Sequence, residues 1–205
     1  MSKYLARLPK PPSQTWRTFL RNHAKALASI DFFVLPTATF RLLMVFIVLH
    51  HERRQIVHFG VTAHPTAAWV AQEITEAFPW DSAPRYVIRD RGSVYGALVR
   101  ARIKAMGIEE VATAPRSRWH NPFVERMIGS IRRECLDHLI VIDERHLRRI
   151  LASYFDYYHR SCTHLSLGKN SPGPRPVESA KAGEVIALPQ VGGLHHHHRY
   201  ERLAA

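Results

Sequence analysis

Three strand-like segments follow one another near the start of the chain, and helices alternate with strands after them. The first three predicted strands cover residues 26–35, 41–49 and 55–61, with a short polar link before the third. Short links favour antiparallel pairing, because parallel strands need a longer crossover connection. The order that follows is helix, strand, helix, strand, helix. We therefore expect an α/β fold with a five-stranded mixed sheet, three strands antiparallel and two parallel, flanked by helices.

The later elements are predicted from the period of the apolar residues and from proline and glycine breakers. Strands are expected over 85–89 and 108–112, and helices over 65–78, over 94–106, from 122 and from 143. The apolar run 42–49 is far shorter than the roughly twenty residues of a membrane span, so it is predicted to be a buried strand. The predicted organisation is a basic lead-in over 1–24, a core domain over 25–178 and an extended C-terminal tail over 179–205.

Charge indicates the kind of partner. The 205 residues include 29 Lys and Arg but 17 Asp and Glu, which gives a net charge of +12. Such an excess favours a polyanion, most often nucleic acid, over a small neutral substrate, although a protein can be basic without binding nucleic acid. The two cysteines, Cys135 and Cys162, lack CxxC spacing, and the start of the chain lacks an apolar signal core. We expect reduced thiols and a cytoplasmic, nucleoid-associated protein with no membrane contact.

Two aspartates lie where acidic residues need an explanation. Asp31 is in the middle of the first predicted strand, where a buried carboxylate is costly without a partner, a metal ion or exposure at an edge. Asp90 follows the fourth predicted strand, at the strand end where open α/β sheets bind ligands, although a turn aspartate has the same placement. A right-handed crossover can make the first and fourth strands neighbours. The two aspartates would then lie side by side.

A third acidic residue opens the helix predicted from residue 122. Asn121 followed by Pro122 is typical of a helix N-cap with proline at the first helical position. Glu125 and Arg132 lie two turns apart at the edge of the apolar stripe, where they can face a phosphodiester. An isolated glutamate in a first turn more often interacts with the helix dipole. The stripe predicted to pack on the core consists of Val124, Ile128, Ile131, Cys135 and Leu139.

Together these residues resemble a known family. Asp31, Asp90 and Glu125, with 35 positions from the second to the third, match the D,D,35-E pattern of the retroviral-integrase-like transposase and integrase core, which has a ribonuclease H-like fold. The segments SIDF (29–32), RDRGS (89–93) and NPFVER (121–126) resemble bacterial insertion-sequence integrases in particular. The similarity extends over roughly 25–178 and includes YYHR (157–160) and HLSL (164–167).

The resemblance implies a metal-dependent polynucleotidyl transferase, which nicks DNA at the ends of a mobile element and joins the 3′-OH to target DNA. Asp31, Asp90 and Glu125 would be the catalytic residues and would hold two Mg²⁺ or Mn²⁺ ions, because hard cations take oxygen ligands. A homo-oligomer in a synaptic complex is the implied assembly. The residues expected to contact DNA are Arg132, Arg133, Asn121 and Arg118; for the first two, a solvated helix face is the alternative.

The chain also departs from the family pattern. A helix-turn-helix region usually precedes the core, and the sequence has no room for one before Asp31. The alternatives are a core-only protein, a fragment of a broken element, or the partner of a separate DNA-binding chain. Other open functions are a nuclease of the same fold without joining activity and a non-catalytic DNA-binding remnant. The family more often has proline and glutamine at Arg118 and His120, and the run His195–His198 is interpreted as a surface tail.

Overall fold

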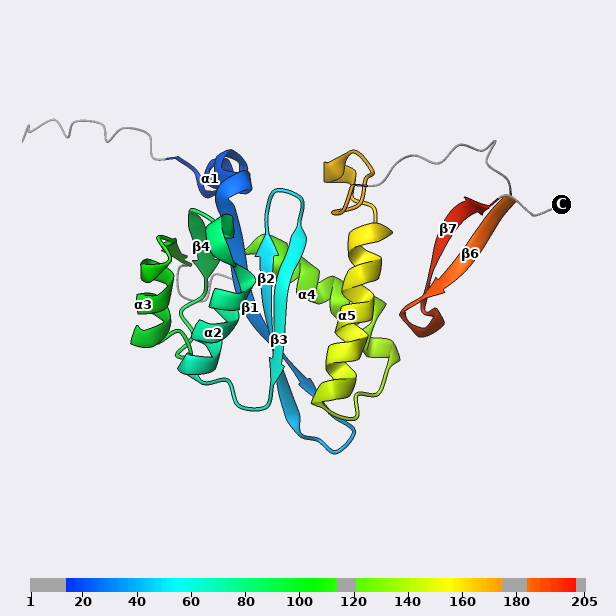
Figure 1. Ribbon diagram of the computed structural model, residues 1–205, viewed down its shortest axis with the longest axis horizontal. Helices are drawn as coiled ribbons and strands as arrows, with labels where there is room; N and C mark the ends of the chain where they lie inside the picture. Colours follow the sequence, from blue (N-terminus) through cyan, green and yellow to red (C-terminus); the bar gives the residue numbers. More distant parts are fainter. Residues whose placement is uncertain (1–13, 114–120, 175–183, 202–205) are drawn as a thin grey trace, which may run out of the picture.

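The computed structural model describes residues 14–113, 121–174 and 184–201, and its centre is a five-stranded sheet in the order β3-β2-β1-β4-β5 (Figure 1). The strands β1, β2 and β3 pair antiparallel, whereas β4 pairs parallel with β1 and with β5. This arrangement confirms the predicted α/β fold with a mixed sheet. The strand bounds are Leu27–Pro36 for β1, Leu42–His50 for β2, Gln55–Thr62 for β3, Tyr86–Arg89 for β4 and Glu109–Ala112 for β5.

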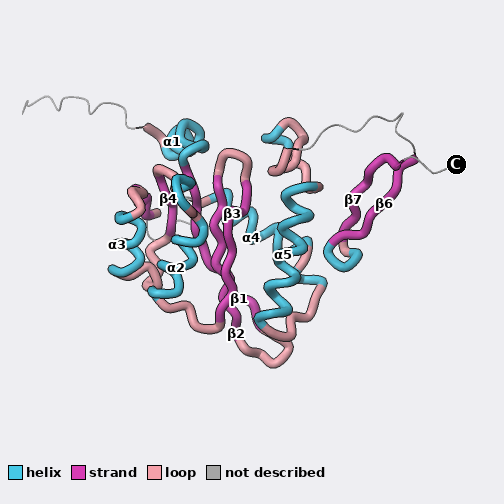
Figure 2. Tube along the Cα trace, viewed as in Figure 1, coloured by secondary structure: helices cyan, strands magenta, loops and turns pink. Residues whose placement is uncertain are grey.

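Helices cover both faces of the sheet, so β2 is an almost continuous apolar run, as strands buried on both sides are. Phe46 and Val48 pack with α2 (Ala67–Ala77) and α3 (Ala97–Ala105). Val45 and Ile47 point the other way and pack with α4 (Pro122–Glu134) and α5 (Glu144–Arg160). Figure 2 shows the strands between these two groups of helices, with α2 and α3 to the left and α5 to the right.

Local capping explains where several helices begin. The hydroxyl of Thr15 accepts a hydrogen bond from the amide of Thr18 at the start of α1 (Trp16–His23), and Thr66 and Asp143 cap α2 and α5 in the same way. Within the described residues, no helix is long and apolar enough to cross a membrane.

The helix α4 follows the predicted stripe for most of its length. Val124, Ile128, Ile131 and Cys135 are buried, and burial raises the pKa of the Cys135 thiol to about 11. Leu139 is 36% exposed, so its place in the stripe is wrong. The reason is that the helix ends at Glu134 and a 3-10 turn (Leu136–His138) follows, which breaks the helical spacing before residue 139.

Part of the predicted extended tail is a β-hairpin. Strands β6 (Glu184–Gln190) and β7 (His195–Glu201) pair antiparallel, and Val191 in their turn is buried in the cluster that α4 and α5 form. The ring of His195 stacks on Tyr157, with centroids 4.3 Å apart. The interpretation of His195–His198 as a surface tail is therefore only partly right, because strand side chains point to opposite faces. His195 contacts α5 and His197 bonds to Ser161 directly after it, whereas His196 and His198 are exposed.

Candidate active site

The register between β1 and β4 brings the first two predicted acidic residues together. Ser29 on β1 pairs with Ile88 on β4, and the strands are parallel. Two residues further along each strand direction, the same register places Asp31 opposite Asp90. Neighbouring strands lie about 4.8 Å apart. The predicted crossover therefore leaves the two aspartates side by side at the carboxyl end of β4.

The third acidic residue lies on the helix that covers this part of β1. Leu27 and Phe33 pack on the side of α4, and Ala28 and Ile30 on the side of α2 and α3. Because strand side chains alternate, Asp31 faces α4. Phe123 near the start of α4 packs beside Leu27, and Arg132 near its end lies over the ring of Phe33. Glu125 is on the same helix between these two contacts, and its side chain is half-buried.

Both aspartates are oriented by the main chain that follows them. The Oδ1 atom of Asp31 accepts a hydrogen bond from the amide of Phe32 (2.8 Å), and Oδ1 of Asp90 accepts one from the amide of Gly92 (3.0 Å). The carboxylate oxygens of these three residues do not all lie within 4.8 Å of one another. Within the described ranges, the group of metal-ligating atoms that meets this distance belongs to His58, Glu73 and Glu76. The predicted acidic residues therefore share one region of the sheet without being drawn into one ion-binding shell.

A buried hydroxyl group adjoins both aspartates. Tyr95, which follows the turn after Asp90, is fully buried, and its hydroxyl has no hydrogen-bond partner among the described residues. Burial raises the pKa of Tyr95 well above its ordinary value, and the negative charges of Asp31 and Asp90 raise it further. A buried donor without a partner is costly. The sequence did not reveal this hydroxyl, which is a buried donor near the charges of both aspartates.

Asn121 holds the start of α4 against β1. It occupies the predicted N-cap position before Pro122, which confirms the predicted start of the helix, but its side chain makes no capping hydrogen bond. The amide Nδ2 instead donates to the carbonyl of Ile30, at 3.4 Å, directly before Asp31. The side chain is 5% exposed, which leaves little surface for the predicted contact with DNA.

The predicted DNA-contacting arginines differ in their surroundings. Nη2 of Arg132 donates to the carbonyl of Val34 (2.9 Å), and its guanidinium lies 5.5 Å from the centroid of the Phe33 ring, so this residue also fastens α4 to β1. Arg133 is exposed on the same helix. Arg118 lies outside the described residues, as do Trp119 and His120.

A buried pair beneath α4 was not predicted. The Oγ atom of Ser29 lies 2.5 Å from Nε2 of His51, and both side chains are buried. Burial, together with the nearby charges of His50 and Arg54, lowers the pKa of His51 to about 3. The neutral imidazole packs against the ring of Phe123, at a centroid distance of 4.8 Å. The pair thus joins β1 and the end of β2 to the start of α4; in the sequence, His51 is only one polar residue in a link between strands.

His51 gives a pH-dependent prediction for stability. Its folded-state pKa is about 3 against an ordinary value of 6.5, so between these pH values the unfolded chain binds more protons at this site. Stability from this group is complete above pH 6.5 and is lost as the pH falls, by up to about 1.4 kcal/mol per pH unit. We expect urea unfolding of the wild type to lose roughly 2–3 kcal/mol more than H51Q between pH 6.5 and 4.5.

The comparison with H51Q isolates this site, because burial also lowers the pKa of His50, His159 and His164 in both proteins. Parallel stability curves for the two proteins would contradict a neutral buried His51.

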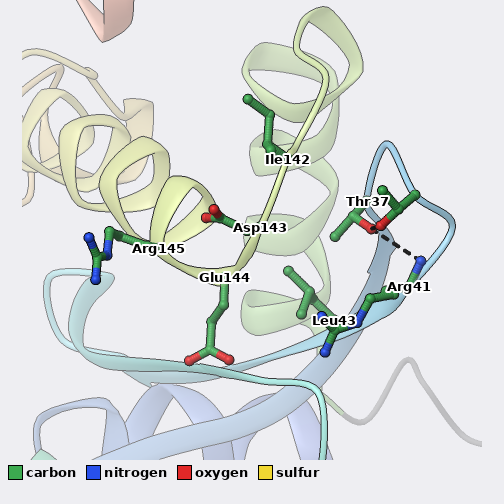
Figure 3. Close-up of a pocket in the computed structure, with 8 residues that line it drawn as sticks. Thr37, Arg41, Leu43, Ile142, Asp143, Glu144 and Arg145 are labelled. Atoms are coloured by element: carbon green, nitrogen blue, oxygen red, sulfur yellow. Dashed lines mark hydrogen bonds between the residues drawn. The ribbon is translucent and has the colours of Figure 1, made fainter.

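A pocket lies elsewhere, at the β1–β2 turn and the start of α5 (Figure 3). Its polar groups already have local roles: Thr37 Oγ1 accepts from the amide of Arg41, and Asp143 caps α5. The turn lies beyond Pro36 on β1, away from the aspartates. The residues that line the pocket are Thr37, Thr39, Arg41, Leu43, Ile142, Asp143, Glu144 and Arg145.

Comparisons with known proteins agree with this fold. Residues 106–172 match the family model described as "Integrase core domain", a range that contains Glu125 but neither aspartate. An insertion element protein of Xanthomonas euvesicatoria, the "IS476 uncharacterized 39.2 kDa protein", is 25% identical over 164 residues, which are 78% of this chain and 43% of that protein. The chain thus spans less than half the length of this curated relative.

Solved structures share the architecture at low sequence identity. The chain in the simian T-cell lymphotropic virus intasome with the PP2A regulatory subunit B56 gamma has a TM-score of 0.60 at 11% identity, covering 82% of this chain and 64% of that one. The HTLV-2 integrase catalytic core domain in complex with magnesium, in its trimeric form, has a TM-score of 0.57 at 10% identity and coverages of 72% and 93%. The BIV integrase catalytic core domain scores 0.54 at 14% identity, with coverages of 72% and 91%.

The five-stranded sheet and its helices form the ribonuclease H-like fold that integrase catalytic cores share. The partial match to the integrase core model and the insertion-element relative show a more specific similarity. The chain is similar to the DDE-type integrase and transposase cores.

Proposed function

We propose that this chain is the catalytic core of a polynucleotidyl transferase that nicks DNA at element ends and joins the 3′-OH to target DNA. The observation that carries the proposal is the parallel register of β1 and β4, which sets Asp31 beside Asp90 under the helix that bears Glu125. The integrase-core match and the insertion-element relative support the same chemistry.

Asp31, Asp90 and Glu125 are the proposed ligands of two Mg²⁺ or Mn²⁺ ions. The donor set fits such ions, because hard divalent cations prefer carboxylate oxygens and keep several water ligands. The buried hydroxyl of Tyr95, without a partner in the described part of the chain, is a suitable donor to such a hydrated site. When bound, the ions would supply charge neutralisation for an in-line displacement at phosphorus.

The chain's own residues hold and orient the DNA in this proposal. The net charge of +12 attracts the phosphate backbone without regard to sequence. Arg132 is fixed by the carbonyl of Val34 and the ring of Phe33, so its remaining N–H groups can position a phosphate. The exposed Arg126 and Arg133 on α4 extend this basic surface beside Glu125.

Recognition of the element ends is assigned to a part of the assembly outside the core. The matched region is 43% of the insertion-element relative, which leaves more than half of that protein for other tasks. The proposed assembly is a homo-oligomer on DNA, in the cytoplasm at the nucleoid. A helix-turn-helix segment on the same chain or on a separate protein would supply the missing specificity.

The test is a strand-transfer assay with end-labelled duplexes that carry the terminal inverted repeats flanking the gene, in Mg²⁺ or Mn²⁺. Joined products longer than the substrate are the expected result. Shortened products alone would identify a nuclease, and a retarded complex without products would identify a non-catalytic DNA-binding remnant. Either of these results would overturn the proposed joining activity.

A further inference from the structure

A second group of metal-ligating side chains lies on β3 and α2. His58 on β3 and two glutamates on α2, Glu73 and Glu76, bring their ligand atoms within 4.8 Å of one another. Nε2 of His58 is 2.5 Å from Oε2 of Glu73. The two glutamates are three residues apart, which places them on one face of the helix. One imidazole and two carboxylates are a ligand set that Zn²⁺ accepts.

The main chain of β3 is shaped to receive Glu73. Gly60 follows His58 by two residues and therefore points to the same face of the strand. A Cβ atom at this position would lie 2.3 Å from Oε2 of Glu73 and 2.7 Å from Cζ2 of Trp69. Any residue with a Cβ atom at this position would displace the carboxylate from the strand. The glycine thus leaves the space in which the carboxylate packs against the strand, next to the imidazole.

The charges of the group are unbalanced without a cation. Glu73 is 8% exposed, and among the ion pairs of the described residues its partner is His58, with no lysine or arginine. A buried carboxylate is costly unless it is paired or coordinates a metal. Glu76, which is exposed, adds a second negative charge and is held by the side-chain amide of Gln72 at 2.9 Å. A divalent cation would balance both carboxylates with a neutral imidazole.

This group is separate from the predicted carboxylate triad. Ile30, Val48 and His58 lie opposite one another across β1, β2 and β3. Ile30 and Val48 pack on the side of α2 and α3, whereas Asp31 faces α4. His58 is therefore two strands away from Ile30 and lies on the opposite face of the sheet from the triad.

We propose that His58, Glu73 and Glu76 form a Zn²⁺ site that fastens α2 to β3. Bonds of about 2.0–2.2 Å to one nitrogen and two oxygens would leave a fourth position for water. Because the ligands come from two elements that meet only in the folded chain, Zn²⁺ should raise the melting temperature.

The test is equilibrium dialysis of the full chain against Zn²⁺ alone, with the bound metal measured for a parent protein and for its Glu76→Gln variant. Glu76 is exposed, so the amide is compatible with folding. All proteins also carry Asp90→Asn, which weakens the triad site equally in each. We expect the variant to bind one fewer tight Zn²⁺ per chain, with affinity at this site reduced at least about tenfold, and to lose the Zn²⁺-dependent rise in melting temperature.

Glu109→Gln is the matched control, because Glu109 is an exposed glutamate on β5, outside the group. This control must bind Zn²⁺ as the parent does, and the histidine run of β7 contributes equally to every protein. His58→Gln, where it folds, should repeat the loss. Equal stoichiometry and equal stabilisation in the parent and in Glu76→Gln would overturn the proposed site. Since the readout is metal binding, failure of the strand-transfer assay would leave this result unaffected.

Discussion

Replacing Asp31 or Asp90 by asparagine, or Glu125 by glutamine, is expected to reduce Mg²⁺-dependent strand transfer at least about a thousandfold. The physical reason is that each amide keeps the shape of the side chain but removes the charge that holds a divalent cation, which is worth several kcal/mol to the transition state. The carbonyl oxygen of asparagine can still accept from the amides of Phe32 and Gly92, so the local main chain should be retained. The measurement is the initial rate of joined product at saturating DNA.

The control for these variants is Asp137→Asn, which removes an exposed carboxylate in the 3-10 turn after α4. Its strand-transfer rate and its circular dichroism spectrum should equal those of the wild type. DNA binding, measured separately at fixed salt, should change little in all four variants, because the phosphate contacts come from cations. Any triad variant that retains more than a tenth of the activity would remove that residue from the proposed site.

The sequence predicted the parts of the fold that depend on periodicity and connection length. The apolar run of β2 and the short links on either side predicted an antiparallel unit, and a right-handed crossover connection allowed β1 and β4 to be neighbours. Asp31 and Asp90 could therefore be paired before any coordinates were available, since their relation depends on strand register. Glu125 was placed on α4 by the spacing of the apolar stripe. Whether these three carboxylates act as the catalytic set remains a prediction.

Other features of the structure depend on contacts between segments far apart in the sequence, which the spacing of apolar residues does not predict. Asn121 was assigned to the N-cap from its type and from Pro122, but its amide reaches Ile30, a contact between segments far apart in sequence. The Ser29–His51 pair likewise joins two strand ends, and neither residue has a distinctive neighbour in the sequence. The β6–β7 hairpin was missed because histidines alternate with histidines in β7, so no apolar period marks the strand.

The point at which the apolar stripe of α4 ends also could not be predicted from the period of its residues. A helical period predicts which residues share a face for as long as the helix continues, and α4 ends at Glu134. Tyr154 on α5 donates to Oε2 of that glutamate at 2.8 Å, and His195 of β7 contacts its carbonyl oxygen. The end of the helix is thus used by two later elements. A period read along one helix contains no information about those contacts.

Ile131→Ala is expected to have the largest effect on stability, a loss of about 2–5 kcal/mol in the free energy of unfolding. Ile131 is fully buried where α4 packs with the sheet and α5, so truncation leaves a cavity that the surrounding strands cannot fill. The measurement is urea unfolding followed by circular dichroism, in which the midpoint should shift while the slope stays constant.

Ile131→Val is the matched variant, because it removes a single methyl-sized group at the same position and should cost about 0.5–1.5 kcal/mol. Arg133→Ala, on the exposed face of the same helix, should change stability by no more than about 0.5 kcal/mol. Since α4 also bears Glu125, strand transfer by folded Ile131→Ala should fall further than that of Ile131→Val at equal folded fraction. Equal costs for alanine and valine would mean that α4 is not seated on the core through Ile131, and the placement of Glu125 near Asp31 would lose its structural basis.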